Sequence, residues 1–573
     1  MKKILAAMLS GAVVLAALGG CGTYTDDGTS SSGSSSSAET SSAESGTGES
    51  TDTSADTSAD PMTFTFIGGQ PVTLNPILSQ STDDGNSFYL LQSSLFRYTA
   101  DGVQNEICET YDVSDDGLTY TFHLRDANWS DGEPITAEHF AYALYCYTSP
   151  DMGCPQASGY YDIAGAEAFN TGSGSWEDVG VKAIDDKTLE ITLTEPNDDY
   201  ILQLATSAPT PLRQDFVEAQ GESLGSSVDA LQYSGPYVLT EWVLDSSLTF
   251  TKNLEYWNAD ESFPVETITL LDVDDANTAY SMFESGEVDA LASVSTQYKD
   301  ALADYTTIQT GGGGMMYIWI NENGMSEEAA AVLSNQNFRN ALNYAIDRSS
   351  TVAAITPLST PYSRLTLPFY EGLDGGSFAD EYPVDCPPLE GDVEQAQEYL
   401  ALALEELGMS SVAELPEMHF VTWDTAQQRL MCETLIDQWK QNLGIETIQL
   451  DQYPIGTAIG NYSSNQFDIF AISISSSLTP YDALENFVNG GDYNNGIWTN
   501  DEYDALVEQV KAATDKAEKY ALTQQAEQIL VDGACIIPFY GLTTAYATQD
   551  YVEGFAIGDL GAGFQFENLQ VNK

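Results

Sequence analysis

Histidine is scarce in this sequence, with three among 573 residues, at positions 123, 139 and 419. Neither His-Glu-x-x-His nor Gly-x-Ser-x-Gly at a strand-to-helix turn occurs, and no Cys/His ligand spacing is present. His123 alternates within an expected strand and His139 lies near an expected helix start, so structural roles are favoured for both. We therefore expect no enzymatic activity, no cofactor and no metal site.

Basic residues are the second deficit. Eighteen Lys and Arg stand against 87 Asp and Glu, which gives a formal charge of −69. Without a basic run or stripe, the chain lacks the electrostatic means to bind nucleic acid or anionic lipid. The acidic surface is compatible with cationic ligands, although solubility explains it more simply.

Long apolar runs are also missing, except at the start of the chain. Lys2 and Lys3 precede an apolar run from Ile4 to Leu18, which is too short to span a bilayer comfortably. Such a pattern predicts a secretory signal with a small-residue cleavage site. Its ending, Leu18-Gly19-Gly20-Cys21, resembles the bacterial lipobox over residues 1–21, in which Cys21 becomes the lipid-bearing first residue.

The anchor predicts the location. We expect the protein on the outer face of the cytoplasmic membrane, extracellular in a Gram-positive-type cell, attached through the lipid on Cys21 only. Residues 22–60 are almost entirely Ser, Thr, Gly, Ala, Asp and Glu, a composition that predicts a disordered tether. The rest is long enough for two or three domains.

Six further cysteines follow, at positions 108, 146, 154, 386, 432 and 535. Export permits disulfides, and Cys146 and Cys154 are close enough in sequence to pair. Cys432 and Cys535 fall on apolar faces of expected elements, which favours buried thiols. The spacing assigns no bridge.

Strands and helices mix without strict alternation. Period-two patterns predict strands over 62–67, 118–124 and 237–242, the last with a hairpin partner at 248–251. Apolar stripes at helical spacing cover 338–346, 432–443 and 522–530; Gly444 and Gly533 are the expected stops of the last two. Thr136 is an expected N-cap. Gly311–Gly314 lacks the Lys-Ser/Thr of a phosphate loop, so a turn or close backbone approach is favoured. We predict a mixed α/β protein of more than one lobe.

Five segments, in order, resemble one family. They are 121–137, 234–257, 338–348, 439–445 and 525–540; the third, Phe338-Arg339-Asn340-Ala341-Leu342-Asn343-Tyr344-Ala345-Ile346-Asp347-Arg348, is the most specific. Together they resemble the extracellular solute-binding proteins of ABC importers, in the oligopeptide/dipeptide/nickel cluster. The resemblance extends over nearly all of residues 62–573.

The resemblance implies a two-lobed, periplasmic-binding-protein-like α/β fold with three structural domains. Lobe I would combine residues 62–98, 232–324 and 537–573, with an inserted domain II at 99–231. Lobe II, domain III, would span 325–536. Ligand would lie in a hinged cleft between the lobes and would shift the open-to-closed equilibrium by its preference for the closed state.

The family's cleft-lining stretches correspond here to Gln80–Asp83, Gly314–Asn321 and Ser473–Pro480. The ligand-binding residues that the resemblance implies are Ser81, Thr82, Asp83, Met316, Tyr317, Trp319, Trp423, Tyr453, Ser475, Ser476 and Ser477. The three aromatics Trp319, Trp423 and Tyr453 suit apolar groups and sugar faces, with plain core roles as the alternative for each.

One departure from the family pattern concerns the amino terminus of a peptide. Where peptide-binding relatives carry an Asp shortly before a Pro, this chain has Ser476 or Ser477 before Pro480, and hydroxyls supply no charge. No basic residue occurs between Ile448 and Pro480 to hold a carboxylate. Asp83 or Asp84 is a candidate replacement for the missing acid.

The sequence thus favours a monomeric, lipid-anchored binding protein that captures peptides, with oligopeptides as the expected ligands, for ABC permease subunits. Oligosaccharide binding on the same fold is the alternative, and capture of a nickel complex is less favoured because histidine is so scarce. A protein that senses or adheres without transport would show the same sequence features.

Overall fold

The computed structural model describes residues 61–573 except 80, 100–101, 207–208, 260, 476, 492, 495 and 559–562, and without the side chains of 310–313. The signal, Cys21, the tether and Ser476 lie outside the described residues. Within these ranges, no helix combines the length and apolar character needed to cross a membrane.

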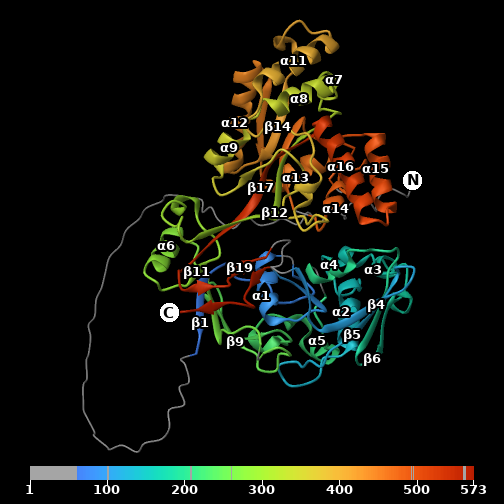
Figure 1. The fold of residues 1–573 in the computed structure, drawn as a ribbon, viewed down its shortest axis with the longest axis vertical. Helices are drawn as coiled ribbons and strands as arrows, with labels where there is room; N and C mark the ends of the chain where they lie inside the picture. The colour runs from blue at the N-terminus through green and yellow to red at the C-terminus, as the bar shows by residue number, and fades with distance from the viewer. Residues whose placement is uncertain are drawn as a thin grey trace, which may run out of the picture.

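Two bodies lie one above the other in Figure 1, and one sheet of eleven strands extends through both. Its order is β15-β14-β16-β12-β17-β11-β1-β10-β9-β8, with β13 (Thr360–Pro361) beside β17. We call residues 315–541 the upper body. The lower body comprises residues 61–305 and 545–573.

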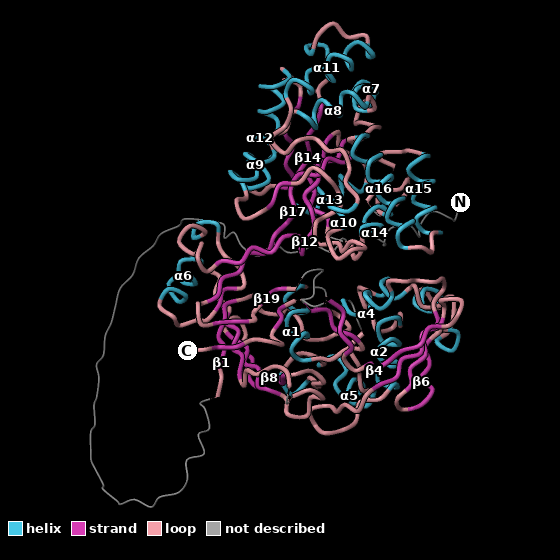
Figure 2. The backbone as a smooth tube through the Cα atoms, in the orientation of Figure 1, coloured by secondary structure: helices cyan, strands magenta, loops and turns pink. Residues whose placement is uncertain are grey.

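Two long antiparallel strands, β12 (Thr306–Ile320) and β17 (Ile536–Thr548), run from one body into the other (Figure 2). Their register shifts between Thr310 and Met315, where the paired residue on β17 changes from Thr543 to Gly541. Above this point both strands pack in the upper core, whereas Ala545 and Ala547 pack in the lower one. The connection between the bodies is therefore a pair of hydrogen-bonded strands.

Gly314 lies at this crossing with φ +120°, a value that L side chains rarely adopt. A Cβ at this position would overlap the carbonyl oxygen of Ile474 on β16. The expectation of a close backbone approach in the glycine run is confirmed.

The upper body holds three parallel strands, β14 (Met418–Trp423), β15 (Ile448–Tyr453) and β16 (Ile469–Ile474), with helices on both faces. One face packs on α7 (Glu327–Leu333), α8 (Gln336–Tyr344), α9 (Arg348–Ile355), α11 (Val393–Leu407) and α12 (Ala426–Leu443). The other packs on α10 (Phe378–Glu381), α13 (Ile455–Ser463), α14 (Pro480–Glu485), α15 (Asp501–Ala512) and α16 (Lys516–Gly533). Burial on both faces suits parallel strands.

The predicted helices of this body are confirmed, with one difference at a terminus. Gly444 ends α12 in the left-handed conformation, as expected. The helix predicted to stop at Gly533 includes that residue, and Ala534 adopts the left-handed conformation at φ 50°. The Ala534 amide donates to the Leu530 carbonyl at 3.1 Å, so the left-handed residue that ends this helix is Ala534 and not Gly533.

The lower body combines part of the large sheet with a separate four-stranded sheet. The large sheet contributes β1 (Thr63–Ile67), β8 (Tyr237–Val243), β9 (Ser247–Lys252), β10 (Thr267–Leu271) and β11 (Ala290–Leu291). The second sheet, β4-β5-β7-β6, comprises Cys108–Val113, Thr119–Leu124, Thr188–Thr192 and Val181–Asp185. Helices α1 (Thr82–Leu91), α2 (Ala137–Thr148), α3 (Ala166–Asn170), α4 (Tyr200–Thr206), α5 (Gln214–Gln220) and α6 (Ala276–Glu284) complete it. Short pairs are β2 (Phe96–Thr99) with β3 (Gly102–Asn105), β18 (Val552–Glu553) with β21 (Gln570–Val571), and β19 (Ala556–Ile557) with β20 (Phe564–Gln565).

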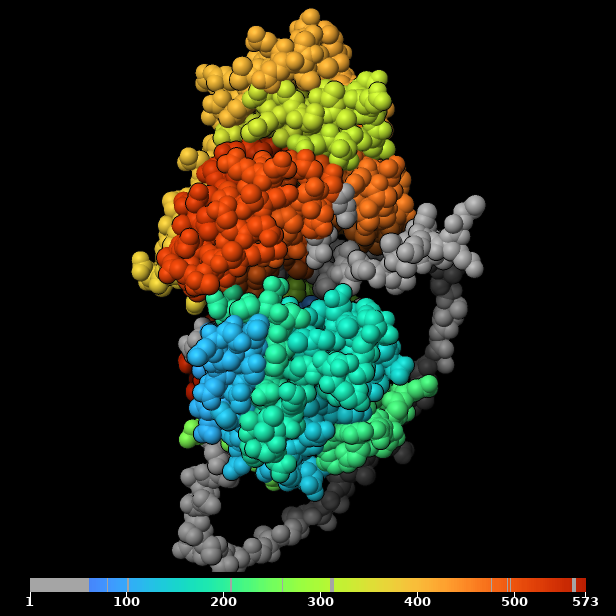
Figure 3. All heavy atoms as spheres, turned by 90° about the vertical axis from the view of Figure 1, so that its right-hand side faces the viewer, coloured from blue at the N-terminus to red at the C-terminus, as the bar shows by residue number. Residues whose placement is uncertain are grey.

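The local predictions for the lower body are confirmed. β8 and β9 form the expected hairpin, and Thr136 precedes α2 in a capping box with His139. All six cysteines of the described chain are free thiols, and Cys432 and Cys535 are buried as expected. Side chains fill the two bodies, and Figure 3 shows a furrow between the upper body, yellow to red, and the lower body, blue to green.

Candidate ligand-binding site

The carboxyl ends of the three parallel upper strands lie at one edge of the sheet. β14 ends at Trp423 and β15 at Tyr453, which are directly paired, and β16 ends at Ile474. This edge faces the lower body (Figure 1). Ligands of open α/β sheets bind outside the carboxyl ends of strands, so this edge is the first place to look for a site.

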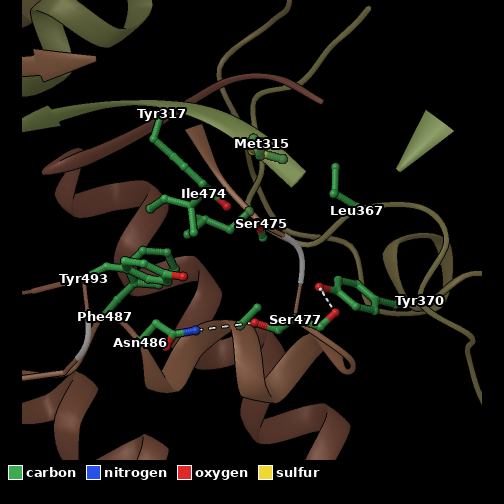
Figure 4. Close-up of a pocket in the computed structure, with 12 residues that line it drawn as sticks. Met315, Tyr317, Leu367, Tyr370, Ile474, Ser475, Ser477, Asn486, Phe487 and Tyr493 are labelled. Carbon is green, nitrogen blue, oxygen red and sulfur yellow. Dashed lines mark hydrogen bonds between the residues drawn. The ribbon is translucent and has the colours of Figure 1, made fainter. Parts of the chain in front are cut away.

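A small cavity lies at this edge, with a volume of about 10 Å³. Its lining is mostly apolar and aromatic with a few polar groups: Met315, Tyr317, Leu365, Leu367, Tyr370, Ile474, Ser475, Ser477, Ala483, Asn486, Phe487 and Tyr493 (Figure 4). Ligand sites commonly combine an apolar wall with a few placed hydrogen-bonding groups. The present volume suits about one water molecule, so a larger ligand requires the walls to move.

Two hydrogen bonds hold the serine segment against this cavity (Figure 4). The Tyr370 hydroxyl donates to the Ser477 carbonyl at 3.1 Å, and Asn486 Nδ2 donates to Ser477 Oγ at 3.4 Å. The donors come from the 365–370 segment and from the end of α14. Both bonds involve Ser477, so displacement of this residue would open the cavity on two sides.

The 365–370 wall is itself fixed by a buried carboxylate on α16. Glu527 has no exposed surface and accepts from the backbone amides of Leu365 at 2.9 Å and Thr366 at 2.8 Å. It also accepts from Thr366 Oγ1 at 2.8 Å and from Arg364 Nη2 at 2.6 Å. Charge-assisted bonds of this kind hold loops firmly, so Glu527 positions one side of the cavity.

Three of the implied residues, Tyr317, Ser475 and Ser477, line the cavity together. Met316 does not, because successive residues of a strand point to opposite faces: Met315 and Tyr317 face the cavity side, and Met316 is buried in the core beneath α8 and α12. The lining methionine is Met315, and Met316 does not line this cavity.

The implied aromatics occupy the core below the same edge. Trp319 has no exposed surface and its ring centroid lies 5.7 Å from that of Phe487. Trp423 is 9% exposed in the same cluster, and the half-buried Tyr453 packs against it. The core alternative therefore describes Trp319 in this structure, whereas Trp423 and Tyr453 border the edge.

The implied residues of the lower body lie at the start of α1. Ser81 caps this helix by accepting from the Asp84 amide at 3.1 Å, and Thr82 is exposed. Asp84 is buried and accepts from the amides of Val72 and Thr73, so its carboxylate serves the fold. The Asp83 side chain is half-buried.

Asp83 is the acid of this pair that is better suited to meet a ligand cation. Burial raises the pKa of its carboxyl, and the charges of Asp84 and Asp272 raise it further. A carboxylate in such surroundings is stabilised by any cation that comes close. The cavity lies in the upper body, whereas Asp83 lies in the lower body.

Most of the residues that line the cavity could not be predicted from the sequence. Tyr370 lies in a segment without periodicity, and Asn486, Phe487 and Tyr493 follow a helix of only six residues. Alternation along β12 predicts that Met315 and Met316 point to opposite faces of the sheet. To tell which of them faces the cavity, the face of one neighbouring residue must be known. Among the described residues, no group of three or more His, Cys, Asp or Glu is arranged to hold a metal ion.

Two α/β lobes are joined by crossing strands, and a small polar-and-aromatic cavity lies at a strand edge that faces the other lobe. This arrangement defines the class of bilobal binding proteins. A model of bacterial extracellular solute-binding proteins, family 5 (middle region), matches residues 102–495. The oligopeptide-binding protein OppA of Bacillus subtilis (strain 168) is 30% identical over 499 residues, covering 85% of this chain and 88% of that protein. The chain belongs to this family of extracellular solute-binding proteins, in the oligopeptide and dipeptide cluster, and the resemblance carried by the five segments is confirmed.

Two further relatives extend the comparison. The probable deoxycholate-binding periplasmic protein YgiS of Escherichia coli (strain K12) is 30% identical over 473 residues, covering 79% of this chain and 83% of that protein. The substrate-binding domain of an oligopeptide ABC transporter from Bacillus anthracis str. Ames has the same fold, with a TM-score of 0.69 at 23% identity, covering 90% of this chain and 99% of that one. The predicted mixed α/β, periplasmic-binding-protein-like fold is confirmed.

Proposed function

We propose that this protein captures peptides between its two lobes and delivers them to the permease of an ABC importer. The observation that carries the proposal is the cavity at the strand edge facing the lower body, in a chain 30% identical to an oligopeptide-binding protein over most of both lengths. No catalytic role is part of the proposal.

The site proposed in the upper body consists of Tyr317, Ser475 and Ser477, joined by Tyr370 and Asn486. These groups supply hydroxyl, amide and backbone hydrogen bonds together with an apolar wall. Such a set suits the main chain and one apolar side chain of an extended peptide. Ser81, Thr82 and Asp83 of the lower body, Trp423 and Tyr453 at the edge, and Ser476, which lies outside the described residues, remain proposed contacts.

The division into lobes is proposed with one adjustment. The packing of β12 and β17 supports crossings near residues 311–314 and 541–543 rather than at 324 and 537. Residues 99–231 remain the inserted domain. The lipid on Cys21, the monomeric state and the permease partner are proposed from the sequence.

A thermal-shift screen of the chain from Asp60 onward tests the function. The library holds peptides of two to eight residues, their N-acetylated twins and oligosaccharides. A ligand at 100 times its Kd adds about 2.7 kcal/mol, which a melting curve detects readily. Stabilisation by peptides, undiminished by acetylation, is expected because no Asp occupies the serine segment. Stabilisation by oligosaccharides alone would contradict the proposal.

A bile acid is the second candidate, favoured by one relative's name and by the largely apolar cavity lining. Deoxycholate therefore belongs in the same screen, below its micelle-forming concentration. A peptide with a free carboxyl end carries a carboxylate as a bile acid does, so the absence of Lys and Arg from the cavity lining does not separate the two. Peptide is placed first because the oligopeptide- and dipeptide-binding relatives match most of this chain. Stabilisation by deoxycholate without any peptide response would reverse this order.

A further inference from the structure

Charged groups of the two bodies face each other across one rim of the furrow, beside the candidate cavity, whose lining includes Ala483 of α14. On the lower body they lie in the segment Glu195–Asp199 that leads into α4. On the upper body they lie on α14 and on the first turns of α16. Figure 1 shows α4 directly below α14, and in Figure 3 the two bodies meet on this side.

Two lysines of α16 are oriented by aromatic rings at this rim. The Lys519 ammonium lies 4.5 Å from the ring centroid of Tyr481, and the Lys516 ammonium lies 5.3 Å from that of Tyr520. The two rings are themselves 6.3 Å apart. Asp199 of the lower body is within electrostatic range of both ammonium groups.

Acids outnumber these lysines. On α14, Asp482 interacts electrostatically with Asp199, Glu485 and Lys519, and Glu485 interacts with Glu195 of the lower body. Lys511 of α15 lies 3.5 Å from Glu485 and 3.8 Å from Glu508, so Glu485 is partly neutralised. Asp482 receives a hydrogen bond from Thr479, and Tyr370 is its other titratable neighbour.

We propose that Asp199 and Lys519 form an interlobe latch that stabilises the approach of the two lobes, and that the adjoining Asp482 makes this approach proton-dependent. The proposal rests on the proposed function, in which the lobes close around a ligand. Lys519 and Asp199 are then positioning residues, which set affinity through the closing equilibrium without touching the ligand.

The direction of the pH effect follows from the surroundings of Asp482. Burial raises the pKa of its carboxyl to about 7, and the charges of Asp199 and Glu485 add to the increase. Burial also raises the pKa values of Asp199 and Glu485. Closing removes more water and brings Asp199 nearer, so the closed arrangement binds protons more tightly than the open one. Acidification from pH 8.5 to 6 therefore favours closing.

Small-angle X-ray scattering of the ligand-free chain measures this equilibrium through the radius of gyration. The wild type is expected to be more compact at pH 6 than at pH 8.5. Lys519→Met is expected to be more extended at both pH values, because Asp199 and Asp482 lose their shared cation. Asp482→Asn is expected to be compact already at pH 8.5 and to lose the pH response.

Two substitutions on the outer surface of α12, Lys440→Met and Asp437→Asn, make the same charge changes far from the furrow and serve as matched controls. They are expected to scatter like the wild type. Equal scattering of Lys519→Met and Lys440→Met, or an unchanged pH response in Asp482→Asn, would overturn the latch. Melting curves without ligand verify that every variant is folded.

Binding separates the latch from the proposed function. With the peptides of the thermal-shift library as probes, Lys519→Met is expected to weaken affinity by up to roughly fivefold at pH 8.5, the upper end of the range for an exposed charge pair. Peptide stabilisation with pH-independent scattering would overturn the latch and leave peptide capture standing. A pH-dependent radius without any peptide response would overturn peptide capture and leave the latch standing.

Discussion

At the scale of single residues, the Glu527 carboxylate joins α16 to a pocket wall more than 150 positions away in the chain. Glu527→Ala leaves the Arg364 guanidinium and two backbone amides without their acceptor. Loss of one partner of a buried ion pair costs about 3–5 kcal/mol. We expect a decrease of this size in the free energy of unfolding, measured by urea denaturation, and weaker stabilisation by peptides. Glu518→Ala, an exposed acid on the same helix, is the control and is expected to change stability by less than about 0.5 kcal/mol.

His139 provides a residue-scale prediction about pH. Its Nδ1 accepts from the Thr136 amide at 3.1 Å and from Trp129 Nε1 at 3.3 Å, so the neutral ring is the form the fold uses. Burial, together with Arg213, lowers the pKa of His139 from 6.5 to about 4. The unfolded chain therefore binds the extra proton first as the pH falls, and stability decreases between about pH 6.5 and 4.

His139→Gln isolates this contribution. Because the ring is only half-buried, we expect it to account for about 1–2 kcal/mol of the pH-dependent loss. Urea unfolding at pH 7.5 and pH 4.5 measures the slope, which should be shallower in His139→Gln. His123→Gln removes a ring that lies on the exposed side of β5 beside Asp112 and should keep the full slope. An equal slope in both variants would contradict the assignment.

At the scale of elements, the crossing of β12 depends on a glycine. Gly314→Ala would force a Cβ into the Ile474 carbonyl at a backbone conformation that disfavours L residues. We expect a loss of about 2 kcal/mol or more in unfolding free energy, because both strain and overlap oppose the fold. Gly456→Ala on α13 has open space around its Cβ and is expected to be neutral or stabilising by up to about 1 kcal/mol. Comparable destabilisation in the two variants would refute the role given to Gly314.

Elements were predictable where their signals are local. The apolar stripe from Cys432 to Leu443, followed by Gly444, lies in α12. It was predictable because nearby residues determine both the buried face and the left-handed terminus. The pairing of β12 with β17 is different, since it joins segments more than 200 residues apart and its register shifts at a glycine run. No local pattern carries that information.

The candidate site was predictable only in part for the same reason. The family resemblance identified the serine segment and the strand Gly314–Asn321, and three implied residues do share the cavity. The register of β12 shifts between Thr310 and Met315, so alternation counted from the start of the strand does not predict the face to which Met316 points. Tyr370 and Asn486 reach Ser477 from segments whose positions depend on Glu527 and on the packing of α14. Such residues become visible only when tertiary contacts are known.

At the scale of the whole molecule, the charge of −69 opposes compactness everywhere at once. Like charges repel through water over a Debye length of about 30 Å at 0.01 M salt and about 3 Å at 1 M. Added NaCl should therefore stabilise this protein, because the folded chain concentrates its charge more than the unfolded chain does. We expect the melting temperature at pH 7.5 to increase by at least ~2 °C, equivalent to about 2 kcal/mol for a chain of this length, between 0.01 and 0.5 M NaCl.

The same titration at pH 4.5 is the control for that prediction. Many of the 87 carboxyl groups are protonated there, since Asp and Glu titrate near pH 4, so the repulsion that salt screens is smaller. The stabilisation by NaCl should shrink accordingly, whereas an effect of salt on apolar surface would persist at both pH values. An equal increase at pH 4.5 and pH 7.5 would therefore assign the salt effect to hydration. A smaller increase at pH 4.5 assigns it to the acidic surface, against which the crossing strands and the cores of both lobes must hold the chain together.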